Sequence, residues 1–96
     1  MGAIEQFMRQ GIRLELADDN NVRAVGALTD HARTAITSRK PQIINELQWQ
    51  QFESLLVIVG PAFGTPADEY PLIREIAQSD LLAALTCYRD LARRTR

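Results

Sequence analysis

Strict alternation of apolar and polar positions over residues 12–17 restricts the fold of this chain more than any other feature of its sequence. Ile12, Leu14 and Leu16 fall on one face of an extended segment, whereas Arg13 and Glu15 fall on the other. This period of two predicts a β-strand with one buried face. A polar stretch follows, and apolar positions then alternate again over residues 21–26. The sequence therefore predicts a β-hairpin.

The predicted register pairs residues whose numbers have an even sum, because only then do the apolar positions of both strands share a face. Pairing Ala17 with Asn21 leaves residues 18–20 as a three-residue loop, in which Asn20 takes the left-handed conformation that such loops need. On the polar face, Glu15 lies opposite Arg23 and forms a favourable cross-strand pair. The apolar pairs are Leu16 with Val22 and Leu14 with Ala24.

An isolated two-stranded hairpin is only marginally stable in water, so other elements must cover its apolar face. The sequence offers helices for this purpose. The segment 3–10 has helical spacing and ends at Gly11, and Thr29 is a suitable N-cap for a helix over residues 30–38. Lys40-Pro41 breaks that helix and begins another. A second copy of the protein could also cover the hairpin.

The remaining residues predict a mainly helical C-terminal half. Apolar positions from Ile44 onward fit either one long helix to about Val59 or two helices joined near Trp49, with Gly60-Pro61 as the end. Thr65 is predicted to cap the next turn. A short helix over 71–78 is expected to turn Leu72, Ile73 and Ile76 inward. Ser79 is expected to cap a last helix, with an inward face made by Leu81, Leu85, Tyr88 and Ala92.

These predictions together give an α+β class: a short helix, a β-hairpin and a mainly helical C-terminal half. The chain has 96 residues, of which 46% are hydrophobic. This size favours a single domain over residues 1–96 with one modest core.

Charge and cysteine content exclude several classes of protein. Eleven basic and twelve acidic residues are spread evenly over both halves of the chain, without the basic excess typical of nucleic-acid binders. The single cysteine, Cys87, cannot form an intrachain disulfide. The opening residues do not form a signal-peptide pattern, and the longest apolar run, 55–59, is too short to span a membrane. We expect a cytoplasmic protein.

No combination of residues in the sequence indicates catalysis. The only imidazole, His31, falls in the first turn of a predicted helix and is expected to face solvent. Cys87 falls within the last predicted helix, where we expect a packed and unreactive thiol. Phosphate-binding glycine loops and zinc-binding motifs are absent from the sequence. We therefore expect a protein that is not an enzyme and has no cofactor and no metal ion.

Two small basic clusters keep a second function open, that of a nucleic-acid or mobile-element accessory protein. The first cluster comprises Arg33, Arg39 and Lys40, and the second comprises Arg93, Arg94 and Arg96. Both clusters lie at predicted helix ends, where positive charge also favours the helix dipole. Aromatic residues for base stacking are not interleaved with them. We regard protein interaction as the leading expectation.

Trp49 has two interpretations that the sequence does not separate. Within a helix its indole falls between the apolar face and the polar face, close to Phe52. A partly exposed tryptophan can serve as an interface anchor. The same residue can instead close a small hydrophobic core.

Three short motifs in the first half form a known order: "GIRL" at residues 11–14, "GALT" at 26–29 and "KPQIINEL" at 40–47. This order resembles the TubC N-terminal docking-domain family over residues 4–48. The resemblance implies a bacterial αββαα docking fold, often homodimeric. Such a fold binds a short peptide from a partner subunit of a peptide or polyketide synthase by extending the edge of its hairpin. The pattern leaves residues 49–96 unexplained as a helical extension.

The resemblance also implies where a peptide would bind, namely along residues 12–16 and 22–26, with Arg13, Arg23 and Val25 on the accessible face. Together with Trp49 as a possible anchor, the candidate partner-binding residues are Ile12, Arg13, Leu14, Glu15, Leu16, Val22, Arg23, Ala24, Val25 and Trp49. The occupant would be a partner peptide or a second copy of the chain. A structural alternative remains, in which the helical half covers the hairpin edge.

Overall fold

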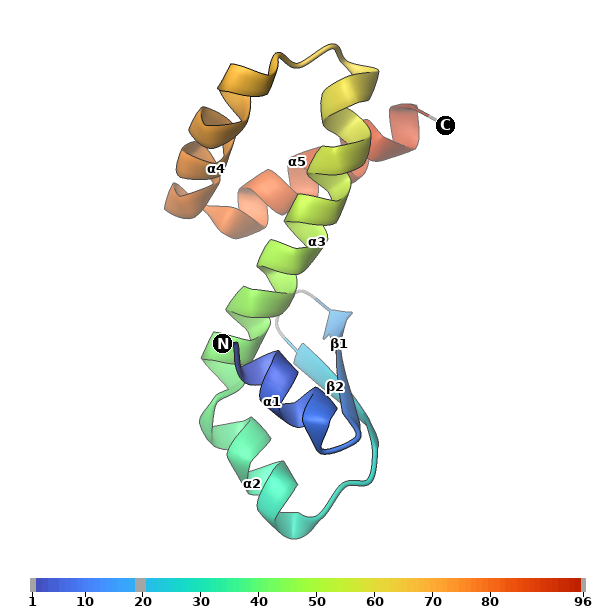
Figure 1. Ribbon diagram of the computed structural model, residues 1–96, viewed down its shortest axis with the longest axis vertical. Coiled ribbons are helices and arrows are strands. Elements are labelled where there is room, and N and C mark those ends of the chain that lie inside the picture. The colour runs from blue at the N-terminus through green and yellow to red at the C-terminus, as the bar shows by residue number, and fades with distance from the viewer. Residues whose placement is uncertain (1, 19–20, 96) are drawn as a thin grey trace. The chain divides into compact units, whose positions relative to one another are not determined.

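The computed structural model describes residues 2–18 and 21–95 and has the predicted α+β class (Figure 1). Its elements in chain order are α1 (Ala3–Arg9), β1 (Ile12–Asp18), β2 (Asn21–Gly26), α2 (Asp30–Ser38), α3 (Lys40–Ala62), a 3-10 turn η1 (Ala67–Glu69), α4 (Tyr70–Ser79) and α5 (Leu81–Arg94). The chain divides into two compact units, Met1–Gln48 and Trp49–Arg96, and the division falls within α3.

In the first unit, β1 and β2 form an antiparallel pair in the predicted register. Leu14 pairs with Ala24, Glu15 with Arg23 and Leu16 with Val22. The predicted pairing of Ala17 with Asn21 is wrong, because Asp18 takes that place. The register shifts between Leu16 and Asp18, so β1 contains an additional residue opposite β2, as in a β-bulge. Asp18 thus belongs to the strand and not to a three-residue loop, while the conformation predicted for Asn20 lies outside the described residues.

The apolar face of the hairpin is covered by helices, as its sequence required. Ile12 and Leu14 are buried against side chains of α1, α2 and α3. The buried residues of this cluster are Ala3, Ile4, Phe7, Ile12, Leu14, Ala32, Ile43 and Leu47. Leu16, Val22 and Ala24 pack against it and remain partly buried. The helices of the same unit therefore bury the apolar positions that make a lone hairpin unstable.

The start of α1 is held by a side chain from a distant part of the chain. The backbone N–H groups of Ala3 and Ile4 donate to the two carboxylate oxygens of Glu46 in α3, at 3.0 and 3.3 Å. The N–H groups of a first helical turn have no partner within the helix, and they favour a negative charge nearby. Glu46 thus supplies the cap that Gly2 cannot supply, since glycine has no side chain to accept a hydrogen bond.

Helices α2 and α3 begin as the sequence predicts, whereas α3 ends later. Thr29 is the N-cap of α2, and Pro41 lies in the first turn of α3. Of the two arrangements that the sequence left open, the structure has one continuous helix. The predicted end at Gly60-Pro61 is wrong, because α3 continues to Ala62. A proline in the last turn lacks only one N–H, and Phe63 N still donates to Val59 O at 3.0 Å.

Replacing Thr29 by alanine should destabilise the protein by about 1 kcal/mol. The Thr29 hydroxyl accepts a hydrogen bond from Ala32 N at 3.0 Å, and alanine would leave that N–H without its partner. Thr34→Ala is the matched control, since the Thr34 hydroxyl only donates to the Asp30 carbonyl within the helix. Urea unfolding followed by circular dichroism measures both variants. Equal effects of the two substitutions would contradict the assignment of Thr29 as the cap.

The second unit has its own hydrophobic core, so the expectation of a single core differs from the structure. Phe52 and Leu56 of α3 are buried against α4 and α5. The buried residues of this cluster are Phe52, Leu56, Ala77, Leu81 and Leu85. Leu81 and Leu85 are buried as predicted for the last helix, whereas Tyr88 and Ala92 are only partly buried. The chain therefore distributes its apolar residues over two small clusters.

Two predicted caps in the second unit are wrong. Asp80, not Ser79, caps α5, since its carboxylate accepts from Ala83 N at 3.1 Å. Aspartate and serine are about equally good at this position, so the choice depends on where α4 ends. Pro66, not Thr65, precedes η1, and this turn has no side-chain cap.

The inward face of α4 was predicted correctly for Ile73 but not for Leu72 and Ile76. Ile73 packs against the second core and Ala77 is buried within it, whereas Leu72 and Ile76 are 56% and 64% exposed. The two residues of each pair are four positions apart, so each pair forms its own stripe on the helix.

Candidate functional site

The candidate site is the hairpin of the first unit, whose two edges are not extended by further strands within the described residues. The sheet there consists of β1 and β2 alone. Over residues 12–17 and 22–26, the backbone hydrogen bonds outside the ladder are limited to one, from Leu28 N to Gly26 O at 2.9 Å. Strand edges carry N–H and C=O groups that can pair with another extended chain.

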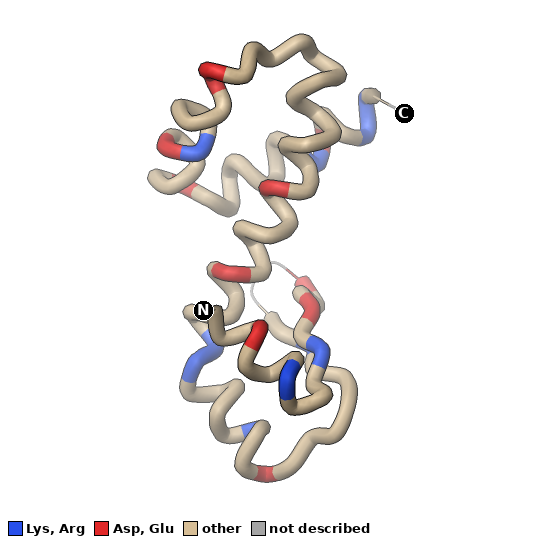
Figure 2. Tube along the Cα trace, in the orientation of Figure 1, with Lys and Arg blue, Asp and Glu red and all other residues tan. Residues whose placement is uncertain are grey.

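The solvent face of the hairpin carries a three-residue charge cluster. The Glu15 carboxylate binds Arg13 of the same strand, with Nε and Oε1 3.0 Å apart, and Arg23 of the other strand through its second oxygen. The hydrogen bond from Arg23 holds the pKa of Glu15 below its usual value of 4.5; desolvation opposes this shift, and the charges of Arg13 and Arg23 add to it. Because two guanidinium groups share one carboxylate, these three side chains together carry one net positive charge. Figure 2 colours the charged positions along the chain.

The contribution of Glu15 to stability should depend on pH. A carboxyl group with a lowered pKa in the folded state stabilises the protein above the pKa of the unfolded state, and this effect is lost as the pH falls through the folded pKa. Glu15→Gln should therefore destabilise the protein at about pH 7 and have a much smaller effect at about pH 3. Urea unfolding of both proteins at the two pH values measures this difference. A difference that does not change with pH would contradict the ion pair.

The predicted binding residues of the hairpin divide into three groups by exposure, of which the partly buried one comprises Glu15, Leu16, Val22 and Ala24. The side chains of Ile12 and Leu14 are buried, so these residues can offer a partner only their backbone. Arg13, Arg23 and Val25 are exposed on the other face, with Val25 half exposed. The accessible site is thus the strand edges and this exposed face.

Trp49 is not part of the hairpin site. It belongs to the second unit, where its ring meets that of Phe52 edge to face, with ring centroids 5.7 Å apart. The ring is partly buried against the second core. Of the two interpretations that the sequence left open, packing against the core is the one these contacts support.

The two residues considered for catalysis, His31 and Cys87, both lie on the surface. His31 is exposed, as expected, whereas Cys87 is exposed and not packed as predicted. On α5, Tyr88 continues the stripe of Leu81 and Leu85 at helical spacing. Cys87 directly precedes Tyr88, so its side chain lies beside this stripe and not within it. Residues 2–18 and 21–95 contain no group of three or more His, Cys, Asp or Glu side chains that could hold a metal ion.

The two basic clusters lie in different units and are partly engaged. In the first cluster, Arg39 donates to Gln6 Oε1 at 2.7 Å and Lys40 donates to Asn21 Oδ1 at 3.1 Å. In the second cluster, Arg94 pairs with Asp90 at 3.0 Å, while Arg96 lies outside the described residues. Arg39, Lys40 and Arg94 thus each form a contact within their own unit.

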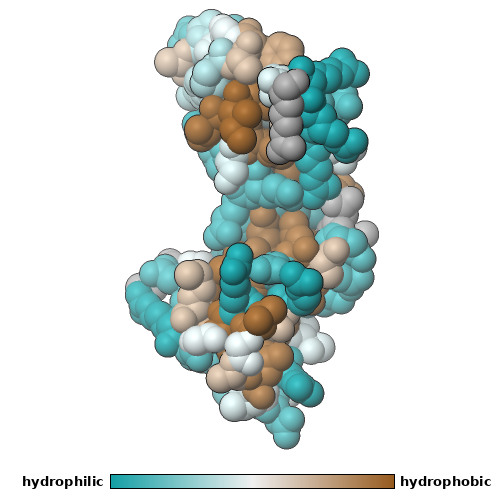
Figure 3. All heavy atoms as spheres, turned by 90° about the vertical axis from the view of Figure 1, so that its right-hand side faces the viewer, coloured by the Kyte–Doolittle hydropathy of each residue, from teal (hydrophilic) through white to brown (hydrophobic). Residues whose placement is uncertain are grey.

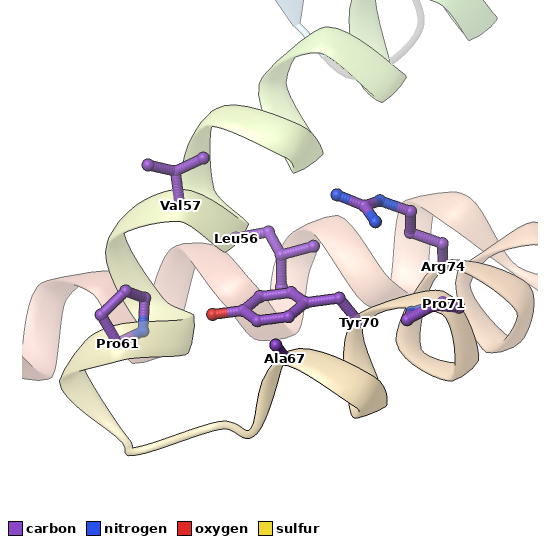
Figure 4. Close-up of a pocket in the computed structure, with 7 residues that line it drawn as sticks. All are labelled: Leu56, Val57, Pro61, Ala67, Tyr70, Pro71 and Arg74. Carbon is purple, nitrogen blue, oxygen red and sulfur yellow. The ribbon is translucent and has the colours of Figure 1, made fainter.

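A pocket of about 450 Å³ in the second unit was not predicted from the sequence (Figure 4). The Tyr70 ring lies across it, with its hydroxyl directed toward α3. Arg74 at its rim holds both carboxylate oxygens of Glu53, at 2.8 and 3.0 Å. The lining residues are Leu56, Val57, Pro61, Ala67, Tyr70, Pro71 and Arg74. The Gly- and Pro-rich stretch 60–71 was the only sign of it in the sequence.

Among the described residues, no helix is both long enough and apolar enough to span a membrane. Comparison of the chain with protein-family models, with curated proteins and with solved structures finds no match in any of the three.

Proposed function

We propose that this chain is a non-catalytic protein-interaction module that binds an extended segment of a partner along an edge of its β-hairpin. The observation that carries the proposal is a two-stranded sheet whose outer edges form no further backbone ladder within the described residues. The partner is a peptide from another protein or a second copy of the chain, and we place the module in the cytoplasm. The resemblance of residues 4–48 to docking domains of the TubC family favours the first kind of partner.

The packing of the hairpin favours binding by strand addition. Ile12 and Leu14 anchor β1 against the helices, so the strands are already ordered before a partner arrives. An added strand then forms backbone hydrogen bonds with an edge whose geometry is set in advance, which reduces the entropic cost of binding.

Side chains of the hairpin would add selectivity to these backbone contacts. The side chains of an added strand alternate between the two faces of the sheet. At the edge of β2, one set would lie beside the exposed Arg23 and Val25, and the other would lie beside the partly buried Val22 and Ala24. A peptide with alternating polar and apolar residues therefore fits this edge best.

Amide hydrogen exchange tests the proposal, with a peptide selected from a phage-displayed library of random sequences. In a strand, outward-pointing N–H groups occur at every second residue of an edge. Strand addition should therefore slow exchange at alternate residues of one strand, either within 12–17 or within 22–26. Protection that lies elsewhere, or failure of the library to yield any peptide that protects these amides, would contradict the proposal.

A matched pair of variants separates binding at the hairpin from general attraction by positive charge. Arg23→Glu changes the exposed face of β2, whereas Arg33→Glu makes the same change at an exposed position of α2. We expect the first substitution to weaken peptide binding at least about tenfold and the second to change it little. Equal losses in both variants would indicate nonspecific electrostatic attraction. Binding to DNA or RNA at low salt tests the accessory-protein alternative directly.

A further inference from the structure

The pocket of about 450 Å³ in the second unit is a feature that binding at the hairpin does not explain. Ligand pockets in proteins typically enclose about 300–1,000 Å³ and combine apolar walls with a few polar groups. This pocket has the same character. Its apolar lining comes from α3, η1 and α4, and its two polar side chains, Tyr70 and Arg74, both come from α4.

The α3 side of this pocket is an apolar surface in contact with solvent. Val57 lines it and is 71% exposed, the highest value among the large hydrophobic residues that the structure describes as exposed. Figure 3 shows that hydrophobic residues, in brown, form patches on a surface that also has large hydrophilic areas. The neighbouring Leu56 is buried and belongs to the second core. A ligand with an apolar body would therefore remove Val57 from water without disturbing the core.

The Tyr70 ring is held in place by a close contact with α3. It lies across the pocket with its hydroxyl directed toward that helix (Figure 4), and it packs against the second core. A Cβ atom at Gly60 would overlap this hydroxyl, so the ring can take its position only because residue 60 has no side chain. Aromatic rings favour offset stacking or edge-to-face contact with another ring. Tyr70 therefore favours a ligand with a flat ring.

The rim of the pocket carries a balanced ion pair. Nε and Nη2 of Arg74 donate to the two carboxylate oxygens of Glu53 at 2.8 and 3.0 Å, and the two side chains are 46% and 41% exposed. A guanidinium group has more N–H groups than this pair uses, and each carboxylate oxygen can accept more than one hydrogen bond. The rim therefore offers a donor and an acceptor side by side, with no net charge.

We propose that this pocket binds a small, uncharged aromatic molecule that carries a carboxamide group. Tyr70 and Arg74 are four residues apart, so they lie on the same face of α4, one turn from each other. The ring of the ligand packs against Tyr70 and Val57. Its amide oxygen accepts from Arg74, and its amide N–H donates to Glu53. Each part of the ligand thus meets a group of matching chemistry.

Ligands of other charge fit the rim less well. A carboxylate would lie beside the carboxylate of Glu53, and a cation would lie beside the guanidinium of Arg74, so each would meet a like charge. A ring without polar groups would cover donors and acceptors of the ion pair and leave them unpaired. An amide avoids all three costs, because it has one donor side and one acceptor side and no charge.

Two-dimensional ¹H–¹⁵N NMR of the full chain tests the proposal with three probes of one shape: benzamide, benzoate and benzamidinium. A probe with so few atoms should bind weakly, with a dissociation constant of about 1–10 mM for benzamide. We expect its chemical-shift changes to centre on residues 53–74, and its affinity to exceed that of both charged probes at least about threefold. Absence of binding, shifts that centre elsewhere, or equal affinities of the three probes would overturn the proposal.

Exposed positions provide variants that test the site without disturbing the core. Val57→Glu should weaken benzamide binding at least about fivefold. Ile58→Glu is the matched control, because Ile58 is 55% exposed on the same helix and does not line the pocket. Arg74→Gln leaves Glu53 without its cation, so this variant should bind benzamidinium more tightly than benzamide. Equal losses at Val57 and Ile58, or an unchanged order of the probes in Arg74→Gln, would overturn the proposal.

Discussion

Phe52→Ala should destabilise the protein by about 3–5 kcal/mol, the largest effect that we expect from a single substitution in the second unit. Phe52 is completely buried at the centre of this core. Its ring meets Trp49 edge to face and is 5.0 Å from the ring of Tyr88, so its removal leaves a cavity and ends both aromatic contacts. The core contains only a few other large side chains, so they cannot fill the space.

Urea unfolding measures this loss, with circular dichroism as the first probe and Trp49 fluorescence as the second. Trp49 is the only tryptophan and packs against this core, so its emission reports on the second unit alone. Phe63→Ala removes the same side chain at a position that is 55% exposed, and it should cost only about 0.5 kcal/mol. Similar losses in the two variants would mean that Phe52 is not the centre of the core.

Gly26→Ala should destabilise the first unit by about 3 kcal/mol or more, because two separate penalties apply. Gly26 has a φ of 130°, which residues with a side chain rarely adopt. A Cβ atom at this position would also overlap the backbone carbonyl oxygen of Gly11. Backbone atoms at a strand end cannot move aside as a flexible side chain can, so the pairing of Ile12 with Gly26 should be lost.

Gly11→Ala separates these two penalties. Gly11 also has a positive φ, 81°, but a Cβ atom there would meet no atom within 4 Å. This variant should therefore lose only the conformational part, about 1–2 kcal/mol. Hydrogen exchange of the β1 and β2 amides and urea unfolding measure both variants. A smaller effect at Gly26 than at Gly11 would contradict the close approach of the two backbones.

The Gly26 substitution also bears on the proposed function. Gly26 ends β2, so a variant that loosens this end should weaken binding at the hairpin edge.

Much of the fold could be predicted from the sequence because its signals are local. Alternation over residues 12–17 predicts the strand, and the need to keep Leu14, Leu16 and Val22 on one face predicts most of the register. The turn was less predictable. Leu16 pairs with Val22 as predicted, but the register then shifts so that Asp18 pairs with Asn21. The alternation of apolar residues does not distinguish such a bulge from a three-residue loop.

The candidate site was predictable in part, for a related reason. The sequence placed Arg13, Glu15 and Arg23 on one face, and the structure joins them through two ion pairs. The sequence could not show how far each strand edge is covered, since that depends on where the helices lie. It also left open whether Trp49 anchors a partner or closes a core, and the ring packs on Phe52 in the second unit.

The sequence by itself determined the elements whose cause lies within a few residues: the alternating strands, the Thr29 cap and the helix that begins near Pro41. Only the tertiary structure decided which stripe of α4 is buried, because Leu72/Ile76 and Ile73/Ala77 have the same helical spacing. It likewise placed Glu46 at the start of α1, more than 40 residues away along the chain. Helical periodicity identifies possible faces, whereas the neighbour that packs against one of them determines which face is used.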